Sequence, residues 1–155
     1  MPLSLNDPID GAELKQLFDP ACPNTTDLEG REEVRGRQLL IYGFRAEPGG
    51  CFETFTPHAG GKTYNPARTG RALVDDPGGN LIQFEEEVSG FPKGSGLVES
   101  KKSVSWDTVR IGDDSYLLPV AGDYVFVLSP KEVWHITVEY THHRHFEAST
   151  NVTFR

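Results

Sequence analysis

The sequence predicts a mainly β protein: a single curved antiparallel sheet of about eight strands in a meander, with one short N-terminal helix packed on it. Two observations support this fold class. Residues 70–88 contain two alternating apolar runs on either side of the turn cluster Asp-Asp-Pro-Gly-Gly-Asn, which is the pattern of a β-hairpin. From residue 102 onward, further alternating runs follow one another with short turn clusters between them. No tandem repeat interrupts this order.

With 155 residues, the chain is long enough for one domain and too short to make two probable on length alone. We expect a single domain over 1–155, with an arm and a short helix in 1–30 and the sheet in 31–155. Asp10 and Glu13 form a capping-box-like helix start, and Asp19-Pro20 ends the helix. Its apolar face consists of Leu14, Leu17 and Phe18. So short a helix is not stable alone, so we expect it to pack on the sheet.

The predicted strands follow the turn residues in chain order. They cover 39–45, 51–55, the two arms of the 70–88 hairpin, 102–111, 116–120, 124–128, 133–145 and 148–154. Pro119 weakens its strand or places it at an edge, because proline cannot donate to the ladder. Side-chain alternation predicts that one sheet face carries Leu40, Phe84, Trp106, Ile136 and Val152. One short helix covers only part of that face, so the sheet either curls on itself or leaves an area for a ligand or partner.

The charge of the chain bounds its partners. A net charge of -8 argues against nucleic-acid binding and against an anionic membrane surface, since both require clustered cations. No apolar run approaches the roughly 18 residues of a membrane span. The first residues have neither the basic start nor the apolar stretch of a signal peptide. The chain is therefore either cytoplasmic or the mature or truncated part of an exported precursor.

The two cysteines, Cys22 and Cys51, stand beside proline and glycine in loop-like segments. A disulfide between them would close a loop of about 28 residues and stabilise the fold by roughly 3 kcal/mol on the loop-entropy description. It would also imply an oxidising compartment. Two unpaired thiols are the alternative. We predict a Cα separation short enough for the bond.

Histidines supply the strongest hint of a metal site. In a strand, His143 and His145 lie on one face, and His135 and Glu139 have the same parity. Such a set could hold zinc or copper. A half-exposed polar strand face explains the same pattern. Because a third ligand at a diagnostic spacing is missing, we predict no metal and no cofactor.

The run Glu85-Glu86-Glu87 is the other candidate for chemistry. Paired carboxylates carry out glycoside hydrolysis when they face each other across a cleft. Alternation puts Glu85 and Glu87 on one face with Gln83, which a solvated sheet face explains better. The sequence contains neither a nucleophile elbow nor a phosphate-binding glycine loop. We therefore predict that the protein is not an enzyme and has no catalytic residues.

Several segments together resemble a group of uncharacterised exported bacterial proteins. These segments are 64–75, 82–87, Phe91-Pro92, 104–112, 116–120 and 144–154. The arrangement over 31–155 is similar to the outer-membrane lipoprotein carrier and sigma-factor-regulator fold. The resemblance implies a curved antiparallel sheet that wraps a helix over an apolar cavity, a periplasmic or exported location, and no catalytic motif. Carriers have more helices and earlier strands, so the chain is expected to be the C-terminal part of a longer protein.

Three functions follow as hypotheses. The first is a non-enzymatic bacterial envelope domain that binds an apolar or lipid-like ligand, or a protein segment, on its curved sheet. The second is a structural interaction module of a larger envelope protein. The third is a small metal-dependent enzyme centred on His135, His143 and His145. The sequence does not define a ligand, a partner or an oligomeric state.

Overall fold

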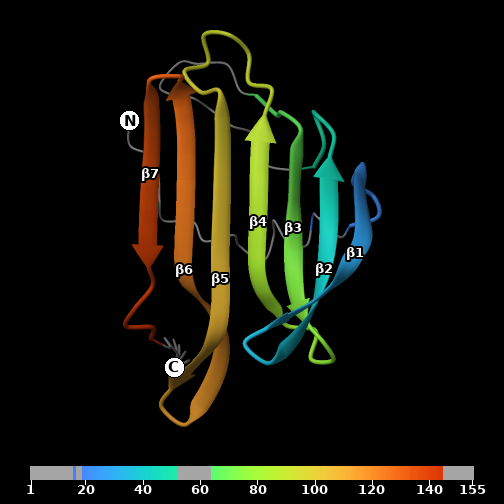
Figure 1. Ribbon diagram of the computed structural model, residues 1–155, viewed down its shortest axis with the longest axis vertical. Helices are drawn as coiled ribbons and strands as arrows, with labels where there is room; N and C mark the ends of the chain where they lie inside the picture. Colours follow the sequence, from blue (N-terminus) through green and yellow to red (C-terminus); the bar gives the residue numbers. More distant parts are fainter. Residues whose placement is uncertain (1–15, 17–18, 52–63, 145–155) are drawn as a thin grey trace, which may run out of the picture.

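The computed structural model describes residues 16, 19–51 and 64–144. These residues form one open antiparallel sheet in which each strand pairs with its sequence neighbours (Figure 1). The seven strands are β1 (Asn24–Val34), β2 (Arg37–Ala46), β3 (Arg68–Asp75), β4 (Leu81–Ser89), β5 (Glu99–Ile111), β6 (Asp114–Ser129) and β7 (Glu132–Glu139). The mainly β meander predicted from the sequence is confirmed.

Strand β1 starts at Asn24, so its first seven residues lie in the 1–30 segment that was expected to hold an arm and a helix, and that boundary was wrong. Its eleven residues are almost all exposed and carry no apolar alternation, because β1 forms an edge of the sheet. It is joined to β2 by a two-residue loop, Arg35-Gly36, in which both residues have positive φ (52° and 76°). This geometry matches the right-handed twist of a hairpin.

Other boundaries differ as well. The two predicted strands 116–120 and 124–128 are parts of the single strand β6, which is sixteen residues long. Pro119 lies at a bulge opposite Trp106. Within the described sheet, β6 pairs with β7 only from Ala121 onward, so the part of β6 that holds Pro119 has β5 as its one neighbouring strand, as the edge prediction requires. A bulge accommodates proline because the ladder is already interrupted there. No helix element occurs in the described residues, and the predicted helix falls outside them except for Gln16. The predicted strands 51–55 and 148–154 also fall outside, apart from Cys51.

The main hydrophobic cluster lies on one face of the sheet, while Leu39 and Leu73, which are also buried, have the opposite parity. Phe84 and Val104 are fully buried at the centre of this cluster, and the Phe84 ring stacks on Phe44 with 5.2 Å between centroids. Trp106 and Ile136 pack against the same cluster, as the alternation predicted. Leu40 has the parity of this face, since it is two positions from Tyr42 in β2, and Val152 lies outside the described residues.

Glycine creates the space that this core requires. Gly70 pairs directly with Phe44, whose ring lies over the position where a side chain would begin. A Cβ there would stand 2.7 Å from two Phe44 ring carbons and would overlap the Glu85 carbonyl oxygen. An aromatic ring from the neighbouring strand thus covers a glycine in the sheet interior.

Among the described residues, no helix is long and apolar enough to cross a membrane.

Candidate functional site

A shallow groove crosses strands β3 to β7 on the face of the sheet opposite the core, and it has a volume of about 590 Å³. We call it the polar groove. Cross-strand pairing brings its side chains into two rows, because directly paired residues point to the same face. One row is Thr69, Glu87, Lys101, Val125 and His135, and the other is Arg71, Glu85, Ser103 and Asp123. The groove is therefore assembled from five strands, and its charged side chains alternate in sign from β3 to β6.

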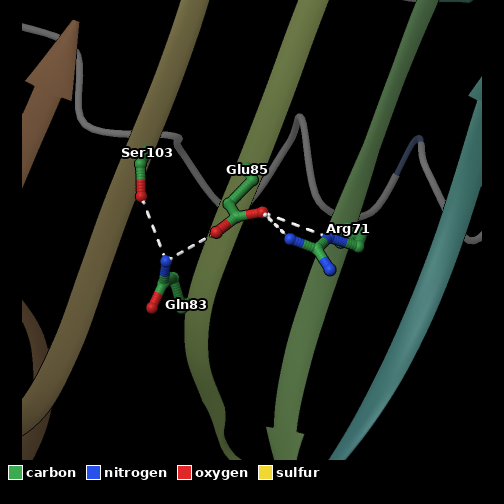
Figure 2. Close-up of polar contacts among 4 residues, drawn as sticks. All are labelled: Arg71, Gln83, Glu85 and Ser103. Atoms are coloured by element: carbon green, nitrogen blue, oxygen red, sulfur yellow. Dashed lines mark hydrogen bonds and ion pairs between the residues drawn. The ribbon is translucent and has the colours of Figure 1, made fainter. Parts of the chain in front are cut away.

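A hydrogen-bonded chain crosses three strands at the β3 side of the groove (Figure 2). Arg71 donates from Nη2 and Nε to one carboxylate oxygen of Glu85, at 2.8 and 3.2 Å. The Gln83 amide donates to the other Glu85 oxygen at 2.8 Å and to the Ser103 hydroxyl at 3.3 Å. The arginine and glutamate side chains are 51% and 33% exposed, so water competes with this ion pair.

Lys101 stands between two carboxylates in the neighbouring row. Its ammonium lies 3.5 Å from Glu87 and 3.6 Å from Glu99. The pKa of Lys101 is raised, first by the negative charge of Glu87 and then by that of Glu99. The alternation argument for Glu85 and Glu87 is confirmed: both lie on the solvated face, and each is paired with a cation.

His135 and His143, which were considered together as metal ligands, lie in different surroundings. His135 Nε2 is 2.6 Å from Asp123 Oδ1 in the groove, whereas His143 Nε2 donates to the Pro119 carbonyl at 2.9 Å. Asp123 and Pro119 are four positions apart on β6, which is roughly 13 Å. His145 lies outside the described residues. Among the residues that are described, no group of three metal-ligating side chains converges.

An ionic cluster on the opposite, buried face was not foreseen from the sequence. Glu86 lies 3.5 Å from Arg68 and 3.4 Å from Lys102, and its side chain is only 3% exposed. The triplet 85–87 therefore divides between two environments: its outer residues face the groove and its middle residue enters the core. Arg68 at the start of β3 was the available signal, since its parity places it on the core face beside Glu86.

The disulfide between Cys22 and Cys51 is present, with a Cα separation of 5.6 Å. This confirms the predicted proximity. Cys22 precedes β1 and Cys51 follows β2, so the bond closes the open end of the first hairpin. It stabilises the edge of the sheet at which β1 makes strand contacts on one side alone.

Within the described part of the chain, the groove lacks the parts of a nucleophilic site. The Ser103 hydroxyl bonds to Gln83, and the ring nitrogen of His135 that makes a contact faces Asp123 and not a serine. Comparison with protein-family models, curated proteins and solved structures gives no match. The resemblance to lipoprotein carriers thus stays a hypothesis.

Proposed function

We propose that this protein is a non-enzymatic binding module that holds an extended polypeptide segment in the polar groove. The observation that supports this proposal is the alternation of solvent-accessible charges from β3 to β6: Arg71, then Glu85 and Glu87, then Lys101, then Asp123. A polypeptide is the ligand class that offers side chains of both signs together with main-chain donors and acceptors. The protein-segment form of the first sequence hypothesis is thereby preferred.

The ion pairs of the groove are suited to exchange. An exposed pair contributes only about 0–1 kcal/mol, because water and salt screen it. Arg71 can therefore leave Glu85 for a carboxylate of a ligand at small cost, and Lys101 can do the same. The Glu85 and Glu87 carboxylates then become available for the cations of the ligand.

An apolar ligand receives less support from the described residues. The fully buried side chains Phe84, Val88 and Val104 are already packed within the core. The groove on the opposite face has charged walls, and burying them under a lipid chain would remove their hydration without replacement. The polypeptide proposal avoids this penalty.

An exported location is part of the proposal. The Cys22–Cys51 disulfide supports it, since such bonds persist in oxidising compartments. The test expresses the protein in cells with and without an export signal and labels its free thiols before the cells are opened. If the protein that stays in the cytoplasm is fully reduced and yet as stable as the exported, disulfide-bonded protein, the result counts against an exported location.

Selection from a random-sequence peptide display library on the full chain tests the binding proposal. Selected peptides should bind the wild type and should lose about tenfold in affinity, or 1.4 kcal/mol, in the double variant Arg71→Ala with Lys101→Ala. The matched control removes two exposed cations outside the groove, Arg110→Ala with Lys131→Ala. Equal losses in both variants, or no enrichment of peptides, would refute the groove as a peptide site.

A further inference from the structure

The two edges of the described sheet differ in how they resist pairing with another strand. β1 is interrupted by a bulge between Leu28 and Gly30, and it contains five charged residues. β7 pairs with β6 without a register shift from Val133 to Glu139. Residues 133–138 of β7 are Val-Trp-His-Ile-Thr-Val, with no lysine, arginine, carboxylate or proline. Bulges, charges and prolines are the devices that protect an edge strand, and β7 lacks them over these six residues.

One hydrogen bond identifies which backbone groups of β7 point away from β6. Tyr140 donates its N–H to the carbonyl of Val120 at 3.0 Å, across the β6–β7 pair. Hydrogen-bonded and non-hydrogen-bonded pairs alternate in an antiparallel ladder. The even-numbered residues of β7 therefore bond toward β6. The odd-numbered residues, Val133, His135, Thr137 and Glu139, direct their N–H and C=O groups away from the described sheet.

We propose that two copies of this chain pair β7 with β7 in antiparallel orientation, about a two-fold axis at Ile136. In this register Val133 is opposite the partner's Glu139, and His135 is opposite the partner's Thr137. All four outward residues then take part, which gives about eight hydrogen bonds at two for each of four pairs. A register centred on His135 would engage only three of these residues and would place the two imidazoles against each other.

The register also matches the faces of the two sheets. A two-fold axis perpendicular to the sheet keeps core face beside core face. Trp134 is then opposite the partner's Val138, and the two Ile136 side chains meet. On the other face, Val133, which is 56% exposed in one copy, becomes partly buried against the partner. Glu139 is opposite the partner's Val133 and thus one position from the partner's Glu132, but alternation directs these two carboxylates to opposite faces of the sheet.

Pairing would join the polar grooves of the two copies. His135 lies at the β7 end of the groove, and the proposed register places the partner's Thr137 beside it on the same face. The second copy thus contributes a hydroxyl to the groove. This inference does not depend on the groove binding a peptide, since it follows from the edge and the register alone.

Sedimentation velocity on the full chain tests the pairing, over concentrations that extend into the millimolar range, because one strand pair makes a small interface. We expect a concentration-dependent dimer in the wild type and in Thr137→Val. Thr137→Pro should remain monomeric, because it removes an outward N–H without removing a bond to β6. A wild type that stays monomeric throughout, or a dimer that persists in folded Thr137→Pro, would overturn the proposal.

Two variants, each with one cysteine added to the native Cys22–Cys51 pair, keep the test decisive if the proline variant does not fold. Ile136→Cys should cross-link to its own copy on oxidation, because the Cα atoms of a central non-hydrogen-bonded pair are about 4.5 Å apart, within the range of a disulfide. Val138→Cys is the control: its copies would stand about 14 Å apart along the strands and should not cross-link. Equal cross-linking in both variants, or none in Ile136→Cys, would overturn the register.

Discussion

A methyl group added at Gly70 tests the account of the core most directly. In Gly70→Ala the new Cβ would stand 2.7 Å from the Phe44 ring and would overlap the Glu85 carbonyl oxygen. Carbon atoms prefer a separation near 3.5–4.0 Å, so the ring has to move by about 1 Å. It has no free direction, because Phe44 stacks on Phe84, which is fully buried. The carbonyl belongs to the ladder between β3 and β4 and resists displacement for a different reason.

Overpacking of this kind costs about 1–3 kcal/mol, and replacing glycine restores roughly 0.4–1 kcal/mol by restricting the unfolded chain. Because both a ring and a main-chain oxygen are displaced, we expect a net loss near 2 kcal/mol, or a decrease in Tm of about 4–8 °C. Gly30→Ala is the matched control, since a Cβ there would meet nothing within 4 Å. It should leave stability unchanged or raise it slightly.

Urea unfolding followed by tryptophan fluorescence measures both variants against the wild type, and the midpoints give the difference in free energy when the slope is unchanged. Phe44→Leu combined with Gly70→Ala should show positive coupling, because the smaller side chain relieves one of the two clashes. Equal stabilities for Gly70→Ala and Gly30→Ala would refute the close approach of Phe44 to Gly70. A double variant that is simply additive would assign the loss to the carbonyl contact alone.

Three further predictions concern the charges and the disulfide. Glu86→Gln should lower the free energy of unfolding by about 3 kcal/mol, because it breaks a buried ionic cluster. Glu85→Gln, on the solvated face, should lower it by less than about 1 kcal/mol. Similar losses in the two variants would contradict the assignment of the two residues to different faces. Replacing Cys22 and Cys51 by serine should cost about 3 kcal/mol in the same assay, and an unchanged midpoint would show that the bond adds nothing to the first hairpin. The stabilisation from Lys101 should be fully present below its ordinary pKa of about 10.4 and should decrease as the pH rises through its raised pKa. The unfolding free energies of wild type and Lys101→Gln should therefore converge at high pH, and a constant difference would exclude the ionic origin.

The hairpins were predictable from the sequence because their information is local. Turn residues and alternation within 70–88 identify β3 and β4 without knowledge of any distant residue. β1 was missed for the complementary reason. An edge strand packs against one neighbour alone and needs no apolar alternation, so its sequence reads as a polar arm.

The candidate site was predictable only in its parts. Alternation placed Glu85 beside Gln83 on a solvated face, and that assignment is confirmed. The groove itself was not foreseen, because it brings together side chains from five strands whose register no single segment defines. The histidines show the opposite case. Parity grouped His135 with His143, but a strand that ends at Glu139 separates them.

The sequence alone determined that this chain forms an antiparallel meander, since period-two alternation and turn chemistry act between near neighbours. It also predicted that Phe84, Trp106 and Ile136 share the core face. Tertiary structure alone decided that Glu86 is buried beside Arg68 and Lys102, that Gly70 lies beneath Phe44, and which residues form the groove. These outcomes depend on the register between strands, and register is fixed by contacts that bring distant residues together, not by any strand on its own.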